Sequence, residues 1–193
     1  MGREAEAGAL RYAGCIGAKV SVEDRKSSFE RVAFIALGSN LGDSISIVRN
    51  AMDLMEEFSA RPLLRSSLWD TTPVDCPPRS PRFVNAAVAI TPREGETPES
   101  LLAKLQALEH TFGRKPKLVL NEARPLDADI VAFGDQIRDS QELTLPHPRA
   151  HLRRFVLQPL AEIAPDFVLP NQSKTVVELL RDLRSDERVV RIE

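Results

Sequence analysis

The sequence predicts an α+β protein, a ferredoxin-like three-layer αβα sandwich with a mainly antiparallel sheet and C-terminal helical additions. The predicted elements follow one another as strand, helix, strand, strand, helix, strand, which is the split βαβ order of that class. Residues 155–185 then supply one or two further helices. With 193 residues, 42% of them hydrophobic, the chain is long enough to bury the core of one globular domain.

The first half of the chain contains a strand, a helix and a second strand. Residues 31–37 are apolar and β-branched, and Gly38-Ser39-Asn40 ends this strand in a tight turn. Asp43 caps a helix whose apolar side chains recur at steps of three and four residues. Residues 62–70 form the next strand. A long loop follows it, because the prolines between residues 73 and 81 lack amide donors and fix φ.

The second half repeats the pattern of strand, helix and strand. In residues 84–90 the large apolar side chains alternate with Asn85, Ala87 and Ala89, so one face is predicted to be core and the other shallow and polar. A helix begins at Thr97-Pro98 and ends at Gly113. A basic loop, residues 114–124, then leads into a strand over residues 126–133.

Composition excludes several classes of protein. No apolar run approaches the ~20 residues that cross a bilayer, so no membrane association is expected. The net charge of −2 gives no overall attraction to nucleic acid. Two distant cysteines form neither a disulfide scaffold nor a zinc site. Residues 1–30 carry charges throughout, so we expect a poorly ordered extension of a cytoplasmic, monomeric protein whose domain is 31–193; the acidic residues argue against an organelle-targeting segment.

The most informative motif is Asp127-Ala128-Asp129. Side chains two residues apart in a strand point to the same face at about 6.5–7 Å spacing, so the two carboxylates project together. Next to apolar Ile130 and Val131 they repel each other and lose solvation unless cations neutralise them. Mg²⁺ fits this role, because it takes one or two carboxylates together with substrate phosphates. The alternative is an edge strand with two solvated carboxylates, since such short motifs also match by accident.

Basic residues precede the acidic pair. Arg114, Lys115, Lys117 and Arg124 can balance phosphate charge, and together with the metal-binding carboxylates they indicate a nucleoside triphosphate. The cluster lacks the interleaved aromatics of a single-stranded nucleic-acid site, which leaves a solvated loop as the other interpretation.

Five ordered fragments resemble the 6-hydroxymethyl-7,8-dihydropterin pyrophosphokinase family of folate biosynthesis. The resemblance covers about Arg31 to Pro170 and rests on residues 36–43, 83–88, Glu109 with Gly113-Arg114, 124–130 and 145–149, followed by 155–160 and 162–165. It implies a pyrophosphokinase that converts ATP and the pterin alcohol to AMP and the pterin diphosphate with two Mg²⁺ ions.

The resemblance also implies roles for individual residues. Asp127 and Asp129 would bind the metal ions, and these two with Arg124 and Arg114 would be catalytic. ATP would contact Gln106, Glu109, Lys117, Ile130, His147 and Arg153. The pterin would stack between Phe83 and Phe155, bond to Asn85 and lie against Thr72, Pro73 and Val74. Read without the resemblance, each Phe is a core residue, His147 caps a turn, and residues 72–74 form a structural turn.

The chain departs from the family pattern in the basic loop. Glu122-Ala123 stands where Gly-Pro is usual, Asn121 where an aromatic is frequent, and Pro116 where a second arginine is frequent. Lys115 or Lys117 can compensate for the missing charge, and a slower enzyme is expected. The general base is not identifiable. Two other functions stay open: a catalytically impaired pterin- or nucleotide-binding module, and a ferredoxin-like RNA-binding module, which would need exposed aromatics on its sheet.

Overall fold

The structure is a computed structural model that describes residue 29 and residues 31–114 and 122–192. Its main sheet has the strand order β5-β1-β4-β3-β8, with β2 also paired to β4, and every pairing is antiparallel. The strands are β1 (Ala33–Ser39), β2 (Leu64–Arg65), β3 (Trp69–Thr71), β4 (Phe83–Ile90), β5 (Asp127–Phe133) and β8 (Val189–Arg191). The ferredoxin-like order predicted from the sequence is confirmed.

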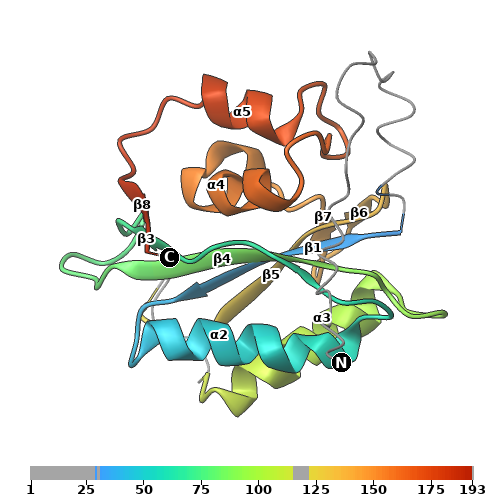
Figure 1. The fold of residues 1–193 in the computed structure, drawn as a ribbon, viewed down its shortest axis with the longest axis horizontal. Coiled ribbons are helices and arrows are strands. Elements are labelled where there is room, and N and C mark those ends of the chain that lie inside the picture. The colour runs from blue at the N-terminus through green and yellow to red at the C-terminus, as the bar shows by residue number, and fades with distance from the viewer. Residues whose placement is uncertain (1–28, 30, 115–121, 193) are drawn as a thin grey trace, which may run out of the picture.

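Helices cover both faces of this sheet. Figure 1 shows α2 (Ser44–Leu54) and α3 (Pro98–Thr111) on one side and α4 (Arg154–Ile163) and α5 (Val176–Asp182) on the other. Both predicted helix starts are confirmed: Asp43 accepts a hydrogen bond from the Ser46 amide, and Thr97 forms a capping box with Ser100. The short helices η1 (Met55–Phe58) and η2 (Ala150–Leu152) and a hairpin of β6 (Arg138–Asp139) and β7 (Thr144–Leu145) complete the described elements.

Each face of the sheet contributes to its own apolar core. Ile35, Val88 and Ile130 pack against α2 and α3, whereas Phe34, Ala87 and Val131 pack against α4 and α5. The expectation that the second face of β4 is shallow was therefore wrong over most of its length. Ala87 and Ala89 are small because α4 lies directly on them, and only the Asn85 end stays open to a cavity.

The predicted strand over residues 62–70 is two short strands, β2 and β3. Both pair with β4, but three residues of the chain, Ser66 to Leu68, lie opposite the two residues Ala86 and Ala87. The extra residue makes a β-bulge. Ser66 fixes it by exchanging hydrogen bonds with the backbone of Ala87, and Glu162 of α4 accepts from the amide of Ser67.

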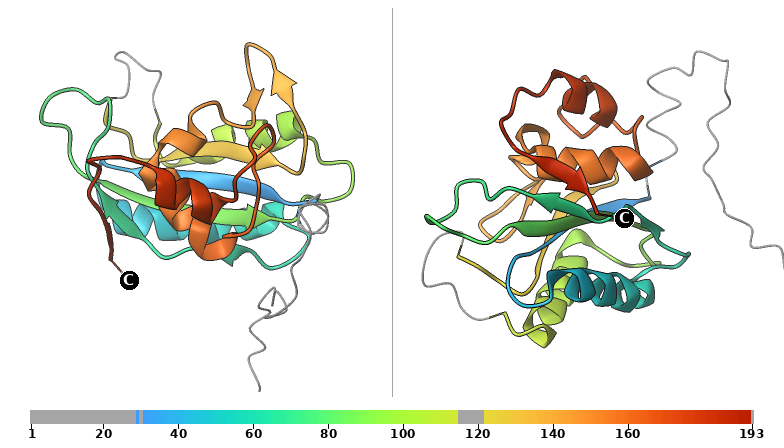
Figure 2. Two further views of the ribbon diagram at one scale, coloured as in Figure 1. Left: turned by 90° about the horizontal axis from the view of Figure 1, so that it is seen from above. Right: turned by 60° about the vertical axis from the view of Figure 1, so that its left-hand side comes forward.

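The end of the described chain returns to the sheet after α5. Figure 2 shows this segment leaving the helical layer, and β8 then pairs along β3 with Val189 opposite Thr71 and Arg191 opposite Trp69. No helix in the described ranges is long and apolar enough to cross a membrane.

Candidate active site

A cavity of about 240 Å³ opens on the α4 face of the sheet, at the ends of β1, β4 and β5. It forms here because Ala36 and Gly38 of β1 are small and Asn85 of β4 is polar, and because α4 begins at its rim instead of crossing it. The residues that line it are Ala36, Leu37, Gly38, Thr71, Thr72, Val74, Cys76, Phe83, Asn85, Arg124, Asp127, Asp129, Val131, His147, Arg149, Ala150, Arg153, Phe155 and Val156.

Asp127 and Asp129 lie together on the cavity wall, as the strand periodicity predicts. Asp129 is exposed to the cavity, but protein surrounds it on its other sides. This enclosure, followed by the charge of Asp127, raises the pKa of Asp129 to about 6, despite nearby Arg153, Arg114 and Arg124. The arginines of the protein therefore do not fully neutralise the pair.

The pair fits a divalent cation that is shared with a substrate. Among the described residues, no group of three or more His, Cys, Asp or Glu side chains is arranged to hold a metal ion. Two carboxylates alone suit Mg²⁺, because phosphate oxygens and water complete its octahedral shell. A structural zinc site would instead require four protein ligands.

Two arginines orient Asp127. The Arg124 Nη1 donates to Asp127 Oδ1 at 3.0 Å, and the Arg114 Nη1 lies 3.1 Å from the same oxygen. The backbone of Arg124 is itself fixed by Asn40. The side-chain Oδ1 of Asn40 accepts from the backbone amide of Arg124 at 2.9 Å, and the backbone amide of Asn40 donates to the Arg124 carbonyl. Asp127 is thus held in one orientation from the loop after β1.

Glu109 supports Arg114 from inside the protein. Its buried carboxylate on α3 pairs with the Arg114 guanidinium and accepts from the Ala128 amide at 2.9 Å. Burial raises the pKa of Glu109 to about 7. Glu109 therefore joins α3 to the strand that carries the acidic pair.

His147 faces the cavity as a neutral side chain. Burial, followed by the charges of Arg153 and Arg149, lowers its pKa to about 4. Its Nδ1 accepts from the Arg149 amide at 3.1 Å, which places the proton on Nε2, a donor suited to an anionic ligand. A second bulge positions it: Phe34 pairs with Ala132 and Ile35 with Ile130, so Val131 is left without a partner in β1, and its carbonyl accepts from the His147 amide.

Asn85 is fixed at the opposite wall. Its Nδ2 donates to the buried Thr71 Oγ1 at 2.7 Å, and it pairs with Gly38 across β1 and β4. A Cβ at position 38 would lie 2.9 Å from Asn85 Oδ1, so only glycine leaves the amide in place. The conformation of Asn85 thus depends on both neighbouring strands.

Two aromatic rings complete this wall. Phe83, at the start of β4, and Phe155, in the first turn of α4, both line the cavity. The Arg153 guanidinium lies 5.3 Å from the centre of the Phe155 ring. Thr72 and Val74 from the proline-rich loop line the cavity as well, whereas Pro73 between them is not one of the lining residues.

Some residues expected at the site lie elsewhere. Gln106 is on the exposed side of α3, and Ile130 is buried in the core against α2 and α3. Glu109 and Arg114 are not among the residues that line the cavity, although Arg114 contacts Asp127, which does. Lys117 falls outside the described residues, as do Pro116 and Asn121. The roles expected for these residues stay predictions.

Sequence reasoning missed two polar residues of the cavity, Thr71 and Arg149. Thr71 directly precedes the expected Thr72. Because side chains alternate along β3, Thr71 and Trp69 point to one face and Asp70 to the other, and Thr71 lines the cavity. Arg149 belongs to the Pro-His-Pro-Arg fragment, so its charge next to His147 was the available indication.

Comparisons with known proteins identify the family to which this chain belongs. The family model described as 7,8-dihydro-6-hydroxymethylpterin-pyrophosphokinase (HPPK) matches residues 34–165. A Haemophilus influenzae 2-amino-4-hydroxy-6-hydroxymethyldihydropteridine pyrophosphokinase is 37% identical over 162 residues, which are 83% of this chain and 97% of that protein. A Synechocystis protein of the same name is 35% identical over 151 residues, or 78% of this chain and 75% of its own length.

A solved structure shows the same fold in a longer chain. A Plasmodium falciparum HPPK-DHPS crystal structure superposes with a TM-score of 0.61 at 15% identity, over 78% of this chain and 42% of the other. The chain thus spans less than half of that fused protein, and this likeness concerns the fold alone.

Proposed function

Because this chain belongs to the 7,8-dihydro-6-hydroxymethylpterin-pyrophosphokinase family, we propose that its cavity is where it transfers pyrophosphate from ATP to 6-hydroxymethyl-7,8-dihydropterin. The products are AMP and the pterin diphosphate, an intermediate of folate biosynthesis. The observation that carries the assignment to this cavity is the acidic pair, Asp127 and Asp129, beside Arg124, His147 and Arg153.

The two sides of the cavity suit the two substrates. The carboxylates and cationic residues at the ends of β5 and around residues 147–153 suit a phosphate chain and its metal ions. Phe83, Phe155 and Asn85 at the opposite wall suit a flat heteroaromatic ring with donors and acceptors on its edge. The pterin therefore lies against β4 and α4, and the phosphates lie against β5.

Asp127 and Asp129 would hold two Mg²⁺ ions. When bound, these ions would neutralise the phosphate oxygens and clamp both substrates for an in-line displacement. The hydroxymethyl oxygen of the pterin attacks the β-phosphorus of ATP, the bond from that phosphorus to the oxygen of AMP breaks, and the proton of the hydroxyl group is released to the solvent.

The side chains of the protein position the substrates and stabilise the charge on the phosphates. Arg124 keeps Asp127 oriented and carries positive charge to the reacting groups, while His147 donates from Nε2 to a phosphate oxygen without changing its own charge. Rate enhancement would come mainly from orientation and from charge fixed in advance.

The test is a direct assay with purified protein. ATP, MgCl₂ and 6-hydroxymethyl-7,8-dihydropterin are expected to yield AMP and the pterin diphosphate in equal amounts. Asp129→Asn should abolish both, whereas Asp139→Asn, which removes the same charge from an exposed position in β6, should not. If neither variant lost activity, the reaction would have to be assigned to another part of the protein. Absence of AMP with the wild-type protein would favour the catalytically impaired module.

A second measurement counts the metal ions. With a non-hydrolysable ATP analogue and Mn²⁺, titration should give two bound ions per chain, and Asp127→Asn should reduce the number. One ion per wild-type chain would overturn the two-metal proposal. The monomeric state, the cytoplasmic location and the domain boundary at residue 31 stay predictions.

A further inference from the structure

The helix that carries Phe155 is capped by a residue that lies far along the chain. The N-cap residue of α4, Arg153, makes no capping hydrogen bond with its own side chain. Instead, the carboxylate of Glu187 accepts from the Arg154 amide at 3.3 Å and from the Phe155 amide at 3.0 Å. A carboxylate at this place satisfies two free amides and opposes the positive end of the helix dipole.

The same segment also fixes the other side of the aromatic wall. The Arg188 amide donates to Thr72 Oγ1 at 3.1 Å, and the Thr72 amide donates to the Arg188 carbonyl at 3.1 Å. Val189 then pairs with Thr71, the residue whose hydroxyl holds Asn85. Residues 187–189 are therefore bonded to the backbones of both Phe155 and Thr72, and both of these residues line the cavity.

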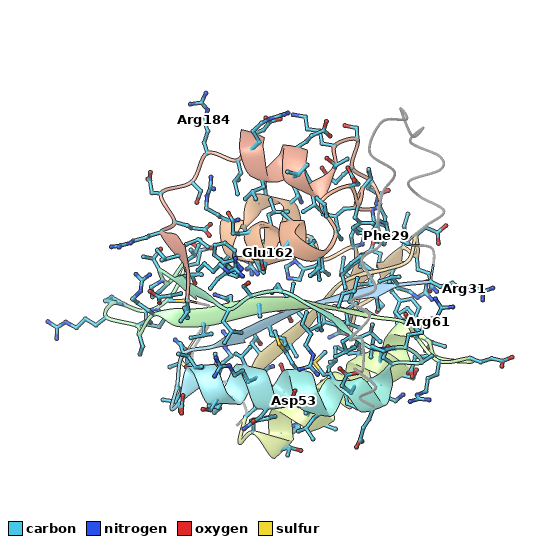
Figure 3. All side chains as sticks on the ribbon, in the orientation of Figure 1. Phe29, Arg31, Asp53, Arg61, Glu162 and Arg184 are labelled. Carbon is cyan, nitrogen blue, oxygen red and sulfur yellow. The ribbon has the colours of Figure 1, made fainter. Side chains whose placement is uncertain are left out.

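Two further contacts lie on either side of residues 187–189. Arg154 donates from Nη2 to the Leu183 carbonyl at 2.9 Å, and the Ile192 amide donates to the Leu68 carbonyl at 2.9 Å. Glu162 of α4, labelled in Figure 3, also accepts from the Ser67 amide and from Nε1 of Trp69 in β3, the strand with which β8 pairs. The segment thus joins α4 to β3 like a strap.

The contacts fall on one side of the site only. The hydrogen bonds of Glu187, Arg188 and Ile192 go to the first turn of α4, to Thr72, to Leu68 and to Ser185, and Val189–Arg191 pair with β3. None of these bonds is made to Asp127, Asp129, Arg124 or His147. Those four residues are held by the loop after β1 and by β5. The segment also lies beyond residues 34–165, the range that the family model matches.

We propose that residues 187–192 form a strap that sets the distance of Phe155 from Thr72 on the pterin side of the cavity, with Glu187 as its positioning residue. This inference rests on the proposed function for the location of the pterin. Glu187 touches no substrate in this proposal; it acts by holding the first turn of α4, and so Phe155, at a fixed distance from Thr72 and Asn85. Its loss should weaken pterin binding more than nucleotide binding, because Arg153 is the one phosphate-side residue of the described ranges that adjoins the capped turn, whereas Asp127, Asp129, Arg124 and His147 lie on other elements.

The experiment compares three full-length variants. Glu187→Ala removes both capping bonds, Glu187→Gln keeps one acceptor oxygen, and Asp186→Asn removes a charge from the exposed neighbouring residue. Dissociation constants for 6-hydroxymethyl-7,8-dihydropterin and for a non-hydrolysable ATP analogue are measured by fluorescence titration in the presence of MgCl₂. Circular dichroism verifies that each variant is folded.

A selective loss of pterin affinity is expected. Glu187→Ala should raise the pterin dissociation constant about tenfold, which corresponds to about 1.4 kcal/mol, and Glu187→Gln about threefold, in keeping with the scale of a helix cap. The constant for the ATP analogue should change less than about threefold in Glu187→Ala, because, of the described residues around the phosphates, only Arg153 adjoins the capped turn. Asp186→Asn should match the wild type in both constants, because the exposed Asp186 side chain takes no part in the contacts of the strap. Equal weakening of both ligands, or unchanged pterin affinity, overturns the proposal. If Glu187→Ala does not fold, the Glu187→Gln result decides by the same criteria.

Amide hydrogen exchange without ligand separates this proposal from the proposed function. Faster exchange of the Arg154, Phe155 and Thr72 amides in Glu187→Gln than in Asp186→Asn supports the strap even if the wild-type protein releases no AMP. Unchanged exchange at these amides refutes the strap while leaving the assigned reaction intact.

Discussion

Replacing Gly38 by alanine tests whether the close approach of β1 and β4 fixes Asn85 for substrate binding. The added Cβ would lie 2.9 Å from Asn85 Oδ1, closer than a carbon and an oxygen without a hydrogen bond normally approach, so the amide has to move. Moving it breaks the 2.7 Å bond from Asn85 Nδ2 to the buried Thr71 Oγ1. A buried polar group left without its partner costs about 1–3 kcal/mol.

If that cost falls on binding of the transition state, kcat/KM for the pterin drops about 5- to 150-fold, since each 1.36 kcal/mol is a factor of ten. The assay is AMP release at saturating ATP and varied pterin. A double-mutant cycle with Asn85→Ala identifies the route of the effect. In that background the Oδ1 atom is gone and the next neighbour of the new Cβ is Phe83 Cδ1 at 3.9 Å, an ordinary contact. Gly38→Ala should then change kcat/KM by less than about twofold. Losses that multiply in the double variant would refute the reasoning.

Three further predictions concern the charged groups. Asp127→Asn and Asp129→Asn should each lower kcat by more than about a hundredfold, because metal-ion catalysis supplies several kcal/mol. The urea midpoint of Asp129→Asn at pH 7 should not fall, since this change relieves the repulsion between the two carboxylates, whereas Asp127→Asn also weakens the ion pairs with Arg124 and Arg114; a lowered midpoint for Asp129→Asn would show that its charge stabilises the fold. The pKa of His147 is lowered from 6.5 to about 4, so the unfolded chain binds more protons in that range, and wild-type stability should rise with pH between about 4 and 6.5. His147→Gln should show a flatter rise in urea midpoints over the same range, and parallel curves would contradict the assigned neutral state. Glu109→Ala should lower the free energy of unfolding by about 3 kcal/mol, because it leaves Arg114 and the Ala128 amide without their buried acceptor, and Glu109→Gln should lose less; calorimetry that ranks the two variants in the opposite order would show that the carboxylate itself is unfavourable there.

Sequence periodicity predicted the parts of the fold that depend on local patterns. Alternation placed Asn85 on the polar face of β4 and Asp127 and Asp129 on one common face of β5, and cap residues located the starts of α2 and α3. These features follow from side-chain direction and free amides, which a few neighbouring residues decide. The cation-rich approach to the acidic strand was recognisable for the same reason.

Features that depend on distant partners were not predictable. Asn40 holds the backbone of Arg124, and Glu187 caps α4, in both cases through residues that are far apart in the chain. The division of residues 62–70 into two strands depends on Glu162 and Ala87, which the local sequence does not include. Likewise, the depth of the Ala87 face was misjudged because an alanine looks the same whether solvent or α4 covers it.

The bulge at Val131 has a consequence for how this strand can change over evolutionary time. Before the bulge, side chains alternate between two environments: Asp127 and Asp129 line the cavity, and Ala128 and Ile130 lie in the apolar core against α2 and α3. At the bulge this alternation slips by one place, so that Val131 and Ala132 both pack toward α4. A one-residue insertion or deletion there would turn every following side chain of the strand to the opposite face of the sheet. This short stretch should therefore tolerate substitution far better than a change in length.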